Sequence, residues 1–183
     1  LTSIFSGAQK QNVSIKPTNS LAFFVSDVVG KVVVDPGAFK VIEATDTQVA
    51  TLSYDFVDLV TKLVLKIPGE LVSNFGTDSA MFVYGQKESF DSKGNLQVGV
   101  TAPNRIVMVA ELKTPSGVSQ VAQNWEATLS NDLKVLFGLG IASKDRPGFL
   151  DNTYRNTSIR YRNFPYSDKT IDYAIVSASN GKT

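Results

Sequence analysis

The sequence predicts an α+β fold in which a mainly antiparallel sheet is covered by two long amphipathic helices. Apolar residues recur at helical spacing in two separate stretches. Short β-branched and aromatic runs, bounded by turn residues, surround both stretches. The 183 residues are 43% hydrophobic and 19% charged, so the chain can bury one substantial core and favours a folded domain over disorder.

The first strands are expected on either side of Asp35-Pro36-Gly37. Proline and glycine suit the two central positions of a turn. Residues 31–34 and 39–42 therefore predict a hairpin, whereas residues 21–29 are compatible with a strand or a helix.

The first helix is expected from Thr45 onward. Thr45 or Asp46 can cap its start, and Pro68 breaks or kinks it before a last turn that ends at Gly76. Its apolar face is expected to cover the sheet and to bury Phe56. The helical spacing is carried by Val49, Leu52, Phe56, Leu59, Val60, Leu63, Val64 and Ile67.

Strand signals return at residues 80–85, 96–100 and 105–112. Between the first two, "DSKGN" (91–95) has Asp91 and Asn95 in place but lacks the rest of a calcium-loop pattern, so it predicts a tight turn.

The second helix is expected within residues 114–140. It opens after a Thr-Pro-Ser sequence and ends at Gly138 or Gly140. The only tryptophan, Trp125, lies at its middle and is expected to be largely buried against the sheet. The apolar stripe is Val118, Val121, Trp125, Leu129, Leu133 and Leu136.

Residues 158–165 and 169–178 predict a last antiparallel hairpin. If Arg162 lies opposite Asp172, Arg160 and Arg162 form an exposed face with Asp172. The other face is then core and carries Ile159, Tyr161, Ile171, Tyr173 and Ile175.

An interaction edge is predicted at the end of this hairpin. Asn180-Gly181 is the favoured pair for a two-residue turn, and no strand follows it in the sequence. The edge is expected to recruit a strand, from a continuation of the chain or from another subunit, with Val13 and Ile15 in a donor segment. The edge residues are Asp172, Tyr173, Ala174, Ile175 and Val176.

Strands, a helix and further strands occur twice along the chain. This order favours two similar halves, 21–90 and 91–183, within one domain that follows a flexible tail or tether at residues 1–20. The alternative is two small domains divided near residues 86–95, each of which would be marginal alone.

The composition argues against catalysis. The chain has no cysteine and no histidine, so it lacks the commonest zinc and copper ligands, thiolate nucleophiles and the usual near-neutral base. Lys113, Ser116 and Glu111 are neighbours without a motif around them. We expect no catalytic residues, no cofactor and no metal site.

Nucleic acid is not an expected partner. The net charge is +1, and although aromatic and basic residues interleave near the last hairpin, the predicted alternation points Tyr161 inward, away from a stacking surface. A protein partner or self-assembly is expected instead.

Two segments, "NWEATLSNDL" (124–133) and "FLDNTYRNTSIRYRNFPYSDKTIDYAIV" (149–176), resemble parts of uncharacterised, membrane-anchored extracytoplasmic α+β proteins of bacteria with reduced genomes. The resemblance covers about residues 105–183. It implies an envelope location and no functional residues. The start at Leu1 agrees with an N-terminal anchor having been removed, which would be the only contact with a membrane.

The expected function is a non-enzymatic, exported structural or surface-interaction domain of a bacterial cell envelope or extracellular assembly, associating through its exposed β-edge. The alternatives are a ligand-binding module of the envelope and a phage or viral structural protein.

Overall fold

The computed structural model shows a mixed α+β protein that is mostly sheet. It describes residues 7–15, 25, 30–46, 57–58, 61, 65–91, 93, 95–133, 148–164, 169–177 and 183. The chain forms two compact units, which interleave along the sequence and therefore do not correspond to the halves 21–90 and 91–183. A single domain from residue 21 onward stays a prediction.

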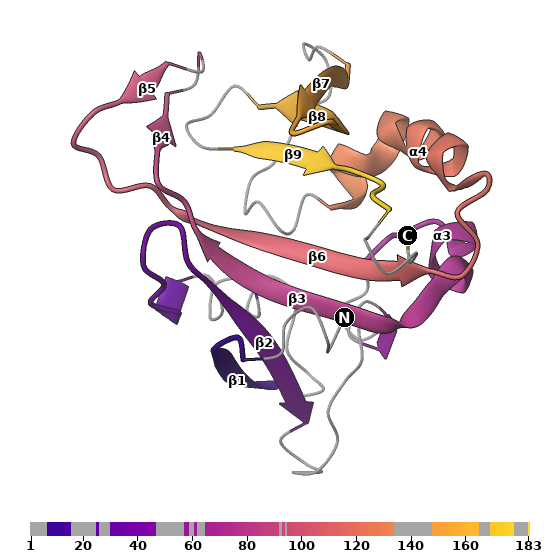
Figure 1. The fold of residues 1–183 in the computed structure, drawn as a ribbon, viewed down its shortest axis with the longest axis horizontal. Helices are drawn as coiled ribbons and strands as arrows, with labels where there is room; N and C mark the ends of the chain where they lie inside the picture. Colours follow the sequence, from indigo (N-terminus) through magenta and orange to yellow (C-terminus); the bar gives the residue numbers. More distant parts are fainter. Residues whose placement is uncertain are drawn as a thin grey trace. The chain divides into compact units, whose positions relative to one another are not determined.

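The first unit contains a four-stranded sheet in the order β1-β2-β3-β6. β1 (Lys10–Ile15) pairs in parallel with β2 (Phe39–Asp46), which pairs antiparallel with β3 (Phe75–Gly85). Figure 1 shows β3 and its neighbour β6 (Asn104–Leu112) running in opposite directions. One strand pair is thus parallel in a sheet that the sequence predicts to be mainly antiparallel.

One face of this sheet carries the apolar core of the first unit. Side chains alternate between the two faces of a strand, and the buried positions follow this period. The register places Val13 opposite Ala44 on the same face as Val83, which is fully buried. The buried residues of the three strands are Val13, Ile42, Ala44, Met81 and Val83.

The predicted turn at Asp35 is confirmed, but the strand predicted before it is not found. The Ala38 N–H donates to the Asp35 carbonyl (2.9 Å), and Gly37 has the positive φ of 84° that the third position of such a turn requires. However, residues 32–34 form no strand, and Phe39 lies opposite Tyr84 in β3. The predicted hairpin of residues 31–34 with 39–42 is therefore wrong.

Gly85 explains why β3 can close against this turn. Its N–H donates to the Ala38 carbonyl (3.0 Å), and its carbonyl accepts from Gly37 (2.7 Å). A Cβ at Gly85 would lie 2.3 Å from the Asp35 carbonyl oxygen. Only glycine permits so close an approach of two backbones.

The predicted first long helix is not found as such. Thr45 and Asp46 are the last residues of β2, and residues 65–68 are not helical. Pro68 instead precedes a separate short helix, α3 (Gly69–Asn74), and β3 follows at once. Most of the predicted apolar stripe, including Phe56, lies outside the described residues, although Val57, Asp58 and Thr61 are helical.

The second unit contains α4 (Val118–Asp132), which confirms the second predicted helix, and the hairpin of β4 (Ser89–Phe90) and β5 (Leu96–Gln97). The helix follows Gly117, which has a φ of 78°, rather than a side-chain cap. Val118 and Leu129 are buried, whereas Trp125 is only half-buried, with its Nε1–H bonded to Asp132. The predicted ends at Gly138 and Gly140 lie outside the described residues.

The turn of the β4–β5 hairpin is built on Asp91. One carboxylate oxygen accepts from the backbone N–H groups of Lys93 and Asn95, both at 2.8 Å, and the other accepts from the Asn95 amide at 3.0 Å. These bonds, that of the Asn95 side chain first, hold the pKa of Asp91 below its usual value. The "DSKGN" segment is thus the predicted tight turn.

The second unit also contains a three-stranded antiparallel sheet in the order β7-β8-β9 (Figure 1). Its strands are β7 (Leu150–Tyr154), β8 (Thr157–Asn163) and β9 (Thr170–Tyr173). β7 and β8 are joined by Arg155 and Asn156, whose φ angles of 46° and 63° indicate a type I′ turn. The sequence analysis predicted β8 and β9 but not β7.

Candidate interaction edge

The three strands and α4 are joined by a group of four polar side chains that we call the Glu126 cluster: Glu126, Asp151, Arg160 and Tyr173. Arg160 Nε donates to Glu126 Oε1 at 2.7 Å, and Nη2 donates to the other carboxylate oxygen. Arg160 Nη1 donates to Asp151 at 2.9 Å, and the Tyr173 hydroxyl donates to Glu126 Oε1 at 2.7 Å. One arginine and one glutamate thus connect the helix to every strand of the sheet.

The strand register places these side chains on one face. Arg160, in the central strand, lies directly opposite Asp151 on one side and opposite Tyr173 on the other. Directly opposite residues of antiparallel strands point to the same face. Arg162 shares this face and donates to the hydroxyl of Ser130 in α4 at 3.3 Å. This face of the sheet is therefore the one that meets α4.

The hydrogen bonds of the cluster shift the pKa values of Glu126, Arg160 and Tyr173 in the directions that preserve these bonds. The Arg160 guanidinium holds the pKa of Glu126 below its usual range, and the same bond raises the pKa of Arg160. Partial burial, and then its bond to Glu126, raises the pKa of Tyr173. At neutral pH the cluster contains an ionised Glu126, a charged Arg160 and a neutral Tyr173.

The predicted register of the last hairpin is wrong by one residue. Asp172 lies opposite Tyr161, not Arg162, and Arg162 lies opposite Ile171. Arg160 and Arg162 therefore face α4 and do not form the predicted exposed face, and the Arg160 side chain is only 22% exposed. Arg160 is held by two carboxylates, a pairing that outweighs the single charge pair assumed from the sequence.

The alternation of hydrogen-bonded and non-hydrogen-bonded residue pairs determines which backbone groups of β9 point away from β8. The Phe164 N–H donates to the Lys169 carbonyl at 2.8 Å, so this is a hydrogen-bonded pair. Such pairs alternate along an antiparallel ladder, which makes Ile171 and Tyr173 the next residues bonded to β8. The N–H and C=O of Asp172 therefore point outward, and within the described part of the chain no strand pairs with this side of β9. We call this side the β9 edge.

The outer edge of β7 differs, because a side chain bonds one of its outward backbone groups. Counting from the two-residue turn, the backbone groups of Thr153 point away from β8. The Thr153 N–H is bonded by Asn152 Oδ1 at 2.8 Å.

One outward backbone group of β1 is bonded in the same way. The Val41 N–H donates to the Gln9 carbonyl, so Gln9 and every second residue after it direct their backbone groups toward β2. Asn12 lies between two such residues, and its carbonyl therefore points outward. There it accepts a hydrogen bond from Gln11 Nε2 at 3.3 Å. An amide side chain thus occupies an outward backbone group on β1 and on β7. Among the described residues, no such bond is formed at Asp172.

The remaining predicted interaction residues are placed as follows. Ala174, Ile175 and Val176 continue the chain after β9 without forming a strand, so the predicted edge strand is shorter than expected. Val13 and Ile15 belong to β1, which pairs with β2 of the same chain. The predicted donor segment is therefore used within the first unit, and residues 10–15 of the predicted tail are ordered into a strand.

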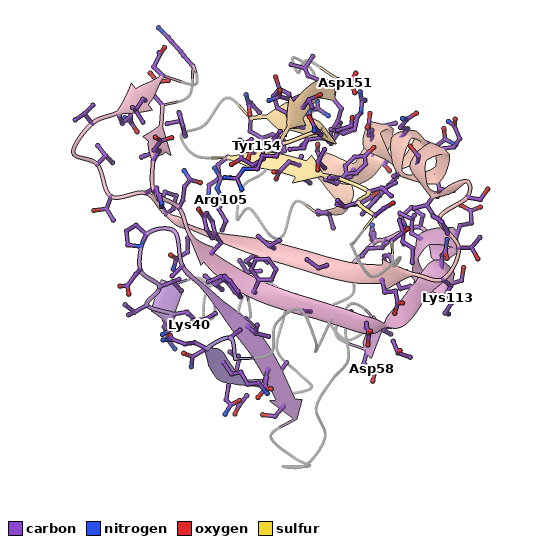
Figure 2. The ribbon with its side chains drawn as sticks, viewed as in Figure 1. Lys40, Asp58, Arg105, Lys113, Asp151 and Tyr154 are labelled. Carbon is purple, nitrogen blue, oxygen red and sulfur yellow. The ribbon has the colours of Figure 1, made fainter. Side chains whose placement is uncertain are left out.

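Of the predicted neighbours Lys113, Ser116 and Glu111, the structure describes a bond from Lys113 to the backbone of α3. Lys113 lies beside α3 (Figure 2), where its ammonium group donates to the Ser73 carbonyl at 3.0 Å. Among the described residues, no group of three or more carboxylates is placed to hold a metal ion, and no helix has the length and apolar character needed to cross a membrane.

No protein-family model matches the chain, and neither a curated protein nor a solved structure matches it. The candidate site consequently depends on the geometry alone.

Sequence reasoning missed Glu126 and Asp151. A signal for Glu126 was present, since it is the only charged residue between Val118 and Asn131 on a helix that covers a sheet. Glutamate is rarely buried without a partner, so a glutamate on the side of a helix that faces a sheet is expected to have one. Asp151 was missed because β7 was missed. Its position on the β7–β8 hairpin, together with that of Tyr154, can be followed in Figure 2.

Proposed function

We propose that the protein is a non-enzymatic structural or surface-interaction domain that associates with another polypeptide by adding a strand to the β9 edge. The observation that carries the proposal is the outward backbone of Asp172, which no side chain caps in the described residues, in contrast to the outward groups of Asn12 and Thr153. Outward backbone groups that nothing bonds, such as those of Asp172, are a template for strand pairing.

The Glu126 cluster supports this role because it fixes β9 in place. Tyr173 is held by Glu126, and its ring lies 6.1 Å from that of Phe149. An edge that is already ordered loses less conformational entropy when a partner strand pairs with it. Placement of the protein in a bacterial cell envelope or extracellular assembly is part of the proposal and depends on the resemblance described above.

The test uses two matched proline variants. Proline removes an N–H without disturbing the inner ladder when that N–H points outward, so Asp172→Pro blocks the β9 edge, and Thr153→Pro makes the matched change on the β7 edge. Wild-type chain and both variants are immobilised, and a library of random peptides displayed on phage is selected against each of them. In parallel, light scattering measures the mass of each protein over a range of concentrations.

We expect the wild type and Thr153→Pro to enrich extended peptides or to self-associate, and Asp172→Pro to do neither. Binding that persists in Asp172→Pro would contradict the proposed edge. A wild-type chain that enriches no peptide and stays monomeric would contradict the proposed function.

A further inference from the structure

Asp172 carries a second property besides its outward backbone, namely a carboxylate that the register leaves without a basic partner among the described residues. It is exposed, and its side chain points to the face away from α4, beside Tyr161. The two arginines of β8 point to the other face, where Arg160 binds Glu126 and Asp151, and Arg162 binds Ser130. The one-residue difference from the predicted register therefore produces an acidic edge.

A strand that pairs with the β9 edge would place one of its residues directly opposite Asp172. Directly opposite side chains lie about 5 Å apart at Cβ, close enough for opposite charges to attract and for like charges to repel. The two flanking residues of that strand would point to the face of α4, beside Ile171 and Tyr173, which are half-buried there.

From this geometry we propose that the partner is an extended peptide segment with a lysine or arginine opposite Asp172 and apolar residues on either side of it. The inference rests on the proposed function, and it adds the chemistry of the partner. It also excludes one form of self-association: two β9 strands paired antiparallel and centred on Asp172 would place two carboxylates opposite each other. The β9 edge is selective because of its one charge, whereas on β1 and on β7 an amide side chain already bonds one outward backbone group.

The test uses synthetic peptides of alternating threonine and valine that differ only in their central residue, which is lysine, glutamate or alanine. Each peptide is N-methylated along one edge, so that it can pair through the other edge only and does not aggregate with itself. Binding to the ¹⁵N-labelled 1–183 chain is followed by the amide signals of β9, which give both the site and the Kd. The same titrations are made with Asp172→Lys, with Asp172→Asn and with Glu70→Lys, an exposed charge reversal in α3 that serves as control.

We expect the lysine peptide to bind the wild type and Glu70→Lys about five- to tenfold more tightly than the glutamate peptide, a ratio that salt reduces. Asp172→Lys should invert this preference, and Asp172→Asn should abolish it. Equal binding of all three peptides at β9 would overturn the inference while the proposed function stands. If none of the peptides shifts the β9 signals, both are overturned.

Discussion

β7 and β9 flank the same central strand, yet their outer edges differ. On β7 the outward N–H of Thr153 is bonded by the neighbouring Asn152 side chain, and on β9 the outward groups of Asp172 are not capped in the described residues. Both strands pair with β8 on their inner side and are bonded to the Glu126 cluster. One side-chain hydrogen bond thus distinguishes the outer side of β7 from that of β9, and under the proposed function this difference makes β9 the edge that pairs with a partner.

The largest effect is expected from proline at an inward position of β9. Ile171→Pro removes an N–H that bonds β8 and should lower the free energy of unfolding by about 3 kcal/mol, the upper end of ordinary substitutions. Asp172→Pro removes only an outward N–H and should cost less than about 1 kcal/mol. Urea unfolding of both variants measures the difference. Equal losses of unfolding free energy would mean that the inward and outward positions of β9 are assigned wrongly.

A smaller effect is expected at the Glu126 cluster, which holds both outer strands. Glu126→Ala leaves Arg160 without its bidentate partner, and because both side chains keep some contact with solvent the loss should be about 2 kcal/mol. Gln123→Ala, an exposed substitution on the same helix, should change stability by less than about 0.5 kcal/mol.

A double-mutant cycle separates this pair from other effects. Glu126→Ala combined with Arg160→Ala should cost less than the sum of the two single substitutions, since no charge is then left unpaired. Strict additivity would show that the pair contributes no coupling.

The pH dependence of stability should show the same cluster. The pKa of Glu126 is lowered from 4.5, so its contribution is fully present above pH 4.5 and is lost as the pH falls through the folded-state value. The pKa of Tyr173 is raised from 10.0, so its contribution is present below pH 10.0 and is lost as the pH rises toward the folded-state value. Unfolding curves of the wild type, Glu126→Gln and Tyr173→Phe, recorded from acidic to alkaline pH, measure the loss of stability at each end. A stability difference from wild type that does not vary with pH would count against the assigned bonds.

Much of the fold follows from local sequence patterns. α4, β3, β6 and the turns at Asp35 and Asp91 were predicted, because each depends on apolar period or turn chemistry within a few residues. β7 was not predicted, because its turn is Arg155-Asn156 rather than a pair containing glycine, and two residues with positive φ are not expected there.

The register of the last hairpin depended on distant residues. The sequence pattern favoured Arg162 opposite Asp172, but the arginines of β8 are positioned by α4 residues such as Glu126 and Ser130, about thirty residues earlier in the chain. That the edge of β9 accepts a strand stays a prediction; of the predicted edge residues, Asp172 and Tyr173 lie in β9. Its distinction from the other edges required the side-chain bonds of Gln11 and Asn152, which no pattern in the sequence indicates.

The smallest effect is expected from a substitution that makes the outer edge of β7 resemble that of β9. Asn152→Ala removes the amide that caps Thr153, so β7 should lose about 0.5 kcal/mol of local stability and acquire an uncapped outward N–H. In the phage selection, this variant should enrich extended peptides that still bind when Asp172→Pro is added. Failure of the double variant to bind any peptide would show that the Asn152 cap is not what closes β7.

Amide hydrogen exchange of the free monomeric chain, resolved by residue in ¹⁵N spectra, measures whether the outward N–H of Asp172 is open. We expect the Asp172 amide to exchange close to the rate of an unprotected peptide while its neighbours Ile171 and Tyr173 are protected, and a bound strand peptide to protect Asp172 as well. An Asp172 amide that is already as protected as its neighbours in the free monomer would contradict the claim, because the β9 edge would then be covered by the chain itself.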